Sequence, residues 1–258
     1  MLLKGNILAI VLYVIAAMLL LTTCSIFDTN EDMVVTKSSK YQIKKLDEPL
    51  VINGVWEKPQ WQKVKAIRIG HFMGGKPEHL PKTEVKMLYD DERIYVIFRV
   101  EDKYVRSVAV ESNSSVWKDS CVEFFFTPGN DVSEGYFNLE TNCGGTILCG
   151  HRTSRNQNIK MVSSEDINFI TIAGSLPRKI DTEIVKPVTW TLEYSVPISL
   201  LEKYANIEKP SPGVFWLANF YKCGDYTSHP HWLTWSYVAS DKPDFHRPDC
   251  FGVLEFGH

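Results

Sequence analysis

The sequence predicts an all-β protein, a jelly-roll-like antiparallel β-sandwich with little helix. Short runs rich in β-branched and aromatic residues recur along most of the chain, and they have the length of strands. Turn-forming pairs separate these runs, namely Asn53-Gly54, Pro128-Gly129, Gly144-Gly145 and Pro212-Gly213. Many short strands with turns between them are typical of sandwiches and barrels, whereas helical patterns are scarce in this chain.

The strands can be assigned in order along the chain. Residues 83–89 and 93–100 are joined by Asp90-Asp91-Glu92, and this arrangement predicts a hairpin. Further strands are expected at residues 122–127, 136–141, 167–172, 190–196, 214–221 and 253–256. Residues 151–187 are mostly polar, and we expect a long irregular excursion that holds only one short strand.

Two short helical segments interrupt this pattern. Residues 197–205 predict a helix with Ser199 as its N-cap, because a serine hydroxyl can accept from the first free backbone N–H groups. Residues 56–61 predict one further turn. No repeat or internal boundary divides the rest, so residues 41–258 are expected to form one domain.

The N-terminal residues have the pattern of an export signal. Lys4 precedes an apolar run at residues 7–21, which is shorter than the roughly 20 residues of a spanning helix. The following Leu21-Thr22-Thr23-Cys24 resembles a bacterial lipobox. We therefore expect a signal peptide at residues 1–23, lipidation of Cys24, a polar tether at residues 24–40, and an exported protein anchored to the bacterial cell envelope. An uncleaved anchor helix is the alternative.

The net charge limits the kinds of binding partner that we expect, and the cysteine content limits the possible disulfides. The formal net charge is −3, which gives no basis for nucleic-acid binding. Besides Cys24 there are five cysteines, at positions 121, 143, 149, 223 and 250, and none forms a CxxC pair. An oxidising compartment would allow two disulfides at most, but buried free thiols are the expected state.

The segment VWKDSCVEFFFTPG at residues 116–129 suggests chemistry, because it places acids beside a strand. If the segment is a strand, alternation puts Val122, Phe124 and Phe126 on the core face. The other face then has Trp117, Asp119, Cys121 and Glu123. Asp119 and Glu123 would lie about 13 Å apart on one strand. Glycoside hydrolysis uses carboxyls roughly 5 to 9.5 Å apart, so this pair is excluded. A cross-strand pair of Glu123 with Glu140 stays open.

Metal-binding patterns are weak. His229-Pro230-His231 would point two imidazoles the same way on an extended segment, although histidines in such loops more often face solvent. Loop carboxylates offer oxygen ligands for a structural calcium ion. These are Asp90, Asp91, Glu92, Asp102, Asp119 and Asp131.

Seven segments occur in an order that resembles the family 9 carbohydrate-binding modules. They are VINGVWEKPQW, MLYDDERIYVIFRVED, VWKDSCVEFFFTPG, YFNLETNCGGTI, WTLEYSVPISLL, PGVFWLANFYK and FHRPDCFGVLEF, and they cover residues 50–256. The resemblance implies a β-sandwich without catalytic machinery, which binds glycan and accompanies polysaccharide-degrading enzymes. It implies no required cofactor, although some members bind structural calcium.

The resemblance also assigns a binding slot between two aromatic side chains. The first is Trp117, and the second is Phe245, where the family tends to have Trp, with His246 beside it. Polar partners would be Glu123, Asn138 and Glu140, of which the last two stand where studied modules have Arg and Asn. Aromatic rings offer flat apolar area to sugar C–H faces, and carboxylates and amides bind hydroxyls. Alternation turns Asn138, Glu140 and Asn142 to one face and Phe137 and Leu139 to the core.

Structural interpretations compete with these assignments. Trp190 and Trp216 are expected in the core and Trp56 and Trp61 at the N-terminal end of the sandwich, whereas Trp232 and Trp235 could border the slot. Glu123 could instead pair with Arg152 or Arg247.

Two other functions also stay open. A haem- or redox-binding domain of the DOMON type would use His246, His151 or Met161 as an axial ligand. A glycoside hydrolase would need a carboxyl pair.

Overall fold

The computed structural model describes residues 39–48 and 50–258. The predicted signal peptide, Cys24 and most of the predicted tether lie outside these residues. Residues 39–258 belong to one compact unit, and Lys40 already starts its first strand. No helix within the described part of the chain is long and apolar enough to cross a membrane.

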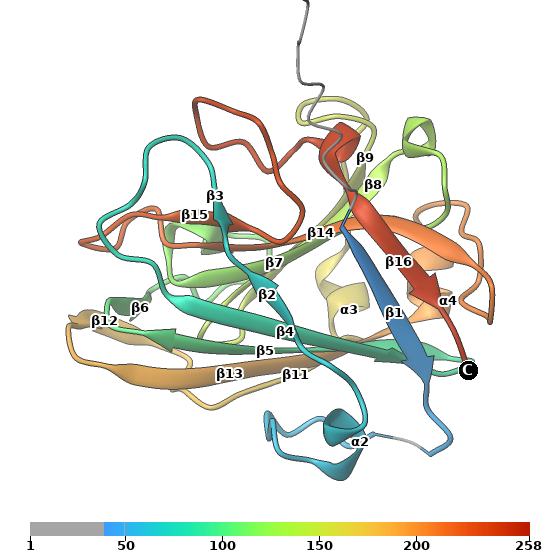
Figure 1. The fold of residues 1–258 in the computed structure, drawn as a ribbon, viewed down its shortest axis with the longest axis horizontal. Coiled ribbons are helices and arrows are strands. Elements are labelled where there is room, and N and C mark those ends of the chain that lie inside the picture. Colours follow the sequence, from blue (N-terminus) through green and yellow to red (C-terminus); the bar gives the residue numbers. More distant parts are fainter. Residues whose placement is uncertain (1–38, 49) are drawn as a thin grey trace, which may run out of the picture. The chain divides into compact units, whose positions relative to one another are not determined.

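The unit is a two-layered β-sandwich, as predicted (Figure 1). One layer has the order β10-β9-β8-β7-β14-β16, with β15 beside β14 and β3 beside β15. The other has the order β4-β5-β13-β11, with β2 beside β4. The strands are β1 (Lys40–Lys45), β2 (Ile67–Ile69), β3 (His71–Phe72), β4 (Lys82–Tyr89), β5 (Arg93–Asp102), β6 (Val105–Ser107), β7 (Cys121–Thr127), β8 (Tyr136–Asn142), β9 (Ile147–Arg152), β10 (Lys160–Met161), β11 (Thr171–Gly174), β12 (Ile180–Ile184), β13 (Val188–Pro197), β14 (Phe215–Cys223), β15 (Trp232–Thr234) and β16 (Gly252–Phe256).

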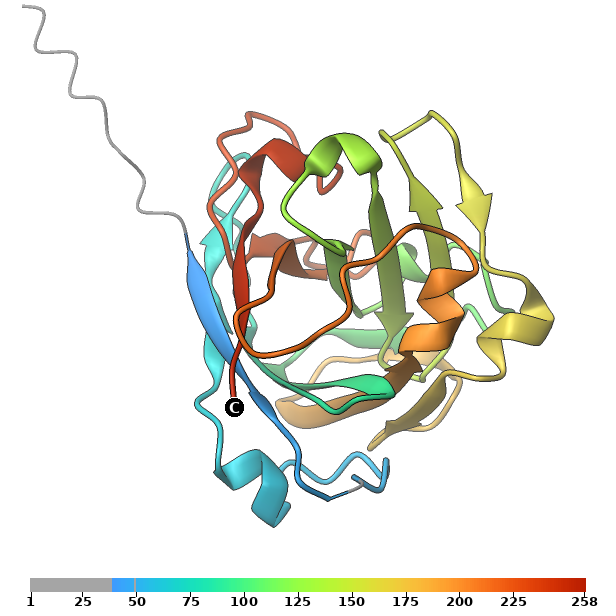
Figure 2. The ribbon, with the colours of Figure 1, turned by 90° about the vertical axis from the view of Figure 1, so that its right-hand side faces the viewer.

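Strand β1 joins the two layers, and it is the exception to the antiparallel pattern. Residues 40–43 pair in parallel with β16, and Lys44 and Lys45 pair in parallel with β4. Figure 2 shows β1 running beside β16 and on toward the second layer. The sheet is therefore continuous and curls around the core between its two layers.

The main core fills the space between the layers. Val122, Phe124 and Phe126 of β7 point into it as alternation predicted, and Phe124 stacks on Phe220 of β14 with ring centroids 4.7 Å apart. Trp190 and Trp216 are fully buried there, which confirms their expected role in packing.

The helices are few and short. They are α2 (Pro59–Gln62), α3 (Ser164–Ile167), α4 (Ile198–Glu202) and the 3₁₀ turns η1 (Val116–Lys118), η2 (Val132–Glu134) and η3 (Pro248–Cys250). The turn expected at residues 56–61 corresponds to α2, where Trp56 and Trp61 pack in a small separate cluster.

One predicted strand and one predicted helix cap are wrong, and hydrogen bonds at the helix starts explain both. The strand expected at residues 167–172 is divided between the end of α3 and β11, because the Ser163 hydroxyl caps α3 by accepting from the Asp166 N–H. Ser199 is not the N-cap of α4. That helix starts directly after β13, and the Ile198 N–H donates to the Glu92 carbonyl of the β4–β5 turn instead.

The excursion at residues 151–187 is more ordered than its polar composition predicted. It contains three short strands, β10, β11 and β12, where one was expected. β10 and β11 extend the two layers at their edges, and β12 pairs with β6 in a separate two-stranded sheet.

Candidate functional site

Both faces of β7 are buried, although only one faces the space between the layers. Phe125 belongs to a second apolar cluster on the outer face of β7, β8 and β14, together with Tyr136, Tyr221 and Phe245. The chain between β14 and β16 contributes Val238, Phe245 and Phe251 to this cluster and so covers the outer face. The site described next lies on that covered face.

A cavity of about 530 Å³ lies over the second cluster. This is within the range of roughly 300–1,000 Å³ that is typical of small-molecule sites. Its walls combine aromatic rings with charged side chains. They comprise Trp117, Glu123, Phe125, Glu140, Leu148, Arg152, Arg155, Cys223, Asp225, Trp232, Pro243, Asp244, Phe245 and His246.

Trp117 reaches the cavity from a 3₁₀ turn and not from the strand. The turn η1 ends before β7 begins at Cys121, so alternation along β7 does not place Trp117. Its backbone is held instead: the Tyr226 N–H donates to the Lys118 carbonyl (3.0 Å), and the Trp117 carbonyl oxygen lies 3.5 Å from the Cys223 sulfur. The indole is half-buried with its edge against Tyr226.

Asp119 has a structural role beside this turn. It is buried, and its Oδ2 accepts from the N–H groups of Val108 and Ala109 (2.8 and 2.9 Å) and from the amide of Asn142. Arg106 pairs with the other oxygen at 3.2 Å. Asp119 therefore ties η1 to neighbouring segments and does not face the cavity.

Two glutamates lie side by side on the cavity floor. Glu123 of β7 and Glu140 of β8 are directly opposite each other in the register, which realises the cross-strand pair that the sequence left open. Burial raises the pKa of Glu140 to about 7, against a lowering contribution from the Asn138 amide, which donates to it at 3.0 Å. Burial also raises the pKa of Glu123 well above its usual range.

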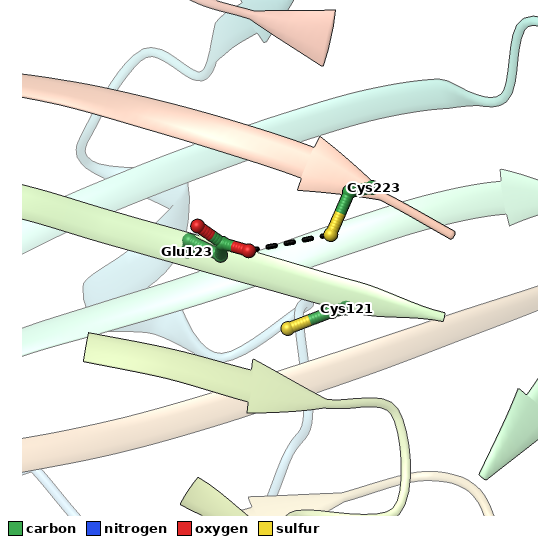
Figure 3. Close-up of side chains that lie close together, drawn as sticks. All are labelled: Cys121, Glu123 and Cys223. Carbon is green, nitrogen blue, oxygen red and sulfur yellow. Dashed lines mark hydrogen bonds between the residues drawn. The ribbon is translucent and has the colours of Figure 1, made fainter. Parts of the chain in front are cut away.

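Glu123 has few hydrogen-bond partners. Within the described residues, its one side-chain partner is the Cys223 thiol, which donates to Oε1 at 3.2 Å (Figure 3). The alternative pairings with arginine are wrong. Arg247 pairs with Asp249, and Arg152 donates through Nε to Oδ1 of Asn138 (3.0 Å). Asn138 is thus buried between Arg152 and Glu140 and orients both, without lining the cavity itself.

Phe245 and His246 also line the cavity. Phe245 is 9% exposed, because one ring face stacks on Tyr221 with centroids 4.2 Å apart. Nδ1 of His246 is hydrogen-bonded to the Tyr136 hydroxyl at 2.8 Å. Burial lowers the pKa of His246 to about 3, with Arg152 and Arg155 lowering it further, so the imidazole is neutral near pH 7.

The cavity also contains residues that the sequence did not single out. Asp225 accepts from the indole N–H of Trp232 (2.7 Å), and this bond fixes the ring that had been considered for the border. Arg155 pairs with Asp244 at 2.6 Å. Trp235, the other border candidate, belongs to the main core. Arg155 and Asp244 come from two loops that are distant in sequence, whereas Asp225 lies just before β15, and no local sequence pattern indicates either pair.

The two histidines considered as metal ligands lie outside the lining of this cavity. His229 stacks on Tyr104 with centroids 3.6 Å apart, whereas His231 is buried and bonds through Nε2 to the Lys222 ammonium (2.8 Å). The two imidazoles therefore do not share a ligand position.

Five of the six carboxylates considered for calcium have protein partners, and Asp119 is described above. Asp90 and Asp131 accept from nearby backbone N–H groups, Asp91 pairs with Lys45, and Asp102 bonds to His79. Calcium binding stays a prediction.

The match to known proteins identifies the fold family. The model of carbohydrate-binding family 9 matches residues 55–256. The chain belongs to carbohydrate-binding family 9. No curated protein sequence matches it.

Solved structures agree with this family 9 fold. A structure of a proposed carbohydrate-binding protein from Bacteroides uniformis is 27% identical, with a TM-score of 0.76, and the match covers 85% of this chain and 99% of that one. A family 9 module from Caldicellulosiruptor kristjanssonii in complex with glucose is 14% identical, with a TM-score of 0.57 and coverages of 84% and 95%. The same organism's module in complex with cellotriose is 14% identical, with a TM-score of 0.56 and coverages of 84% and 93%. At this identity the two modules support the fold alone.

Proposed function

We propose that this family 9 domain binds glycan, without catalysis, in the cavity over β7 and β8. The proposal is carried by one observation: the residues assigned from the sequence come together in the structure. Five of the six residues assigned from the sequence line one cavity although they come from three separate stretches of the chain: Trp117, Glu123, Glu140, Phe245 and His246. The sixth, Asn138, orients Glu140 from below. The complexes of related modules with glucose and cellotriose support a sugar as the ligand.

The chemistry of the cavity suits a sugar. The half-buried indoles of Trp117 and Trp232 supply flat apolar area for C–H faces. Glu123 and Glu140 have free hydrogen-bonding capacity on the cavity floor, and hydroxyl groups can both donate and accept there. Phe245 contributes less ring area than a tryptophan would, because Tyr221 covers one of its faces. We expect Trp117 to make the larger contribution.

The test is a glycan array probed with the full chain and with Trp117→Ala. We expect retention by at least one glycan and loss of that retention in the variant, at an unchanged melting temperature, since Trp117 is half-buried in a 3₁₀ turn. Phe169→Ala is the matched control: Phe169 is a 58% exposed aromatic residue outside the cavity lining, and its removal should leave retention unchanged.

Two outcomes would contradict the proposal. The first is undiminished retention by Trp117→Ala, which would place the ligand elsewhere. The second is loss of the folded state in that variant, which would make Trp117 a residue required for folding.

We further propose that the domain acts outside the cytoplasm, anchored through lipidated Cys24 to the bacterial cell envelope, where it would hold glycan for polysaccharide-degrading enzymes. The signal pattern at residues 1–23 and the polar residues that follow it support this location. Cell fractionation tests it. The native chain should appear in the membrane fraction, and Cys24→Ala should be released from it. Retention of Cys24→Ala in the membrane would favour an uncleaved anchor instead.

Glycoside hydrolysis is the second candidate, because Glu123 and Glu140 face each other at the spacing of a cross-strand pair. Hydrolysis requires two carboxyls with different protonation states. Here burial raises the pKa of both acids, that of Glu140 to about 7, which disfavours the ionised form that a nucleophile needs. We therefore expect no turnover of aryl-glycosides, and measurable turnover that disappears in Glu140→Gln would overturn this expectation.

The geometry gives little support to haem binding. His151 packs against Phe137 on the core side of the sheet, whereas His246 lies on the cavity side. Met161, the third candidate ligand, is exposed on β10, so His246 is the one candidate within the described residues that lines the cavity. A Soret band in the purified protein would contradict this conclusion.

A further inference from the structure

A cluster of soft and hard metal ligands lies at the cavity floor. Cys121 of β7 and Cys223 of β14 are directly opposite each other in the register, and Glu123 is two residues further along β7, so all three side chains share one face. The two sulfur atoms and a carboxylate oxygen lie within 4.8 Å of one another (Figure 3). All three residues are buried.

This spacing is close to that of a tetrahedral zinc site. Zinc binds thiolate sulfur at about 2.3 Å and carboxylate oxygen at about 2.0–2.2 Å, which separates neighbouring ligand atoms by roughly 3.4–3.8 Å. Small side-chain rotations would bring the three ligands to these distances. Two thiolates favour zinc-type ions over calcium or magnesium, which prefer oxygen ligands.

The cavity provides both an entry path and a fourth coordination position. Glu123 and Cys223 line the cavity, and Cys121 lies beside them in the apolar cluster below. An ion held by the three residues would therefore keep one position open toward the cavity, where water can complete the tetrahedron.

Both thiols are unreactive while no ion is bound. Burial raises the pKa of Cys121 to about 12 and that of Cys223 well above its usual range, so both thiols stay protonated at neutral pH. A coordinated metal ion deprotonates its thiol ligands, so binding releases one proton from each thiol.

We propose that Cys121, Cys223 and Glu123 form a binding site for one zinc-type divalent cation at the floor of the cavity. The site needs neither Trp117 nor a sugar. It shares Glu123 with the proposed glycan site, so the Co²⁺ titration of the cysteine variants and the glycan array with Trp117→Ala test the two proposals separately.

Cobalt(II) titration of the reduced full chain tests this proposal, because Co²⁺ reports thiolate ligands through a sulfur-to-metal charge-transfer band. The background carries Cys24→Ser and Cys250→Ser, which remove the cysteine outside the described residues and the one described cysteine that is not buried. We expect the band to saturate at one Co²⁺ per chain and to disappear on addition of one equivalent of Zn²⁺.

Three variants in this background locate the ion. Cys121→Ser and Cys223→Ser should each weaken Co²⁺ binding by more than about tenfold and remove part of the band. Cys149→Ser is the matched control, since Cys149 is an equally buried thiol in the main core outside the cluster, and it should leave the titration unchanged. If a cysteine variant does not fold by circular dichroism, Glu123→Gln replaces it, with weaker binding at an intact sulfur band expected.

Absence of the band in the reduced background would overturn the proposal. So would a band that persists unchanged in both Cys121→Ser and Glu123→Gln, because the ion would then be held by other residues.

Discussion

Two buried glutamates of this fold differ in how many hydrogen bonds their carboxyl groups accept. Glu193 of β13 is fully buried and accepts from four donors: the backbone N–H groups of Asn53 and Gly54, the Lys58 ammonium and the Trp61 indole. Glu123 of β7 is 2% exposed, and its side-chain partner in the described structure is a single thiol.

This difference in hydrogen bonding distinguishes a structural acid from a candidate binding residue. A buried carboxylate that has its full set of donors fixes the chain around it, and Glu193 fixes the loop that carries α2. A buried carboxyl with spare hydrogen-bonding capacity costs stability, and it persists where a ligand or ion makes use of that capacity. Glu123 meets this description at the floor of a cavity that also holds Glu140.

The largest effect on stability is expected at Glu193. Glu193→Gln removes the charge that Lys58 pairs with and replaces one acceptor with a donor, next to donors that then lose their partner. Breaking such a buried pair should lower the free energy of unfolding by ~3 kcal/mol or more. Urea denaturation measures this change, and glycan retention by the folded fraction should be unaltered. A change below about 1 kcal/mol would remove the contrast between the two acids.

An intermediate effect is expected at His246 as pH falls. The folded protein holds this imidazole with a pKa of about 3, whereas the unfolded chain binds the proton near its ordinary pKa of about 6.5. Between these values the unfolded state binds more protons, so acidification destabilises the fold, and this contribution is absent above about pH 7.

His246→Asn isolates the contribution of this imidazole to the pH dependence of stability, because asparagine keeps a polar group for the Tyr136 hydroxyl and does not titrate. From pH 8 to pH 5 the native chain should lose up to about 2 kcal/mol more stability than the variant. Chemical denaturation of both proteins at the two pH values measures the difference. Parallel losses would show that His246 is protonated in the folded state.

The smallest effect on stability is expected at Glu123. Burial favours the neutral form of Glu123, which resembles glutamine in shape and charge, so Glu123→Gln should change the free energy of unfolding by less than about 1 kcal/mol. Glycan affinity should fall by about tenfold, because the amide changes the donors and acceptors offered to a hydroxyl. Titration calorimetry with a glycan retained on the array measures the affinity. A large loss of stability with unchanged affinity would make Glu123 equivalent to Glu193.

The sequence predicted the sandwich because its strands carry local signals. In β8 the alternation of Phe137 and Leu139 with Asn138 and Glu140 fixed which residues face the core, and the structure has the same arrangement. The parallel pairing of β1 with two different strands carries no such signal, since it depends on contacts between the two ends of the chain.

The site was predictable only in part. Family resemblance brought Trp117 and Phe245 together, although they are distant in sequence, but it could not show that Tyr221 covers one face of Phe245. The proximity of Cys121 to Cys223 depends on the pairing of β7 with β14, and strand register over such a separation is not written in either segment.

The most direct test of the glycan site is a crystal structure of the protein with a glycan identified on the array. The account predicts a sugar ring in the cavity, with one face against Trp117 and a hydroxyl hydrogen-bonded to Glu123 or Glu140. A sugar bound outside this cavity, or one that contacts neither acid, would contradict it.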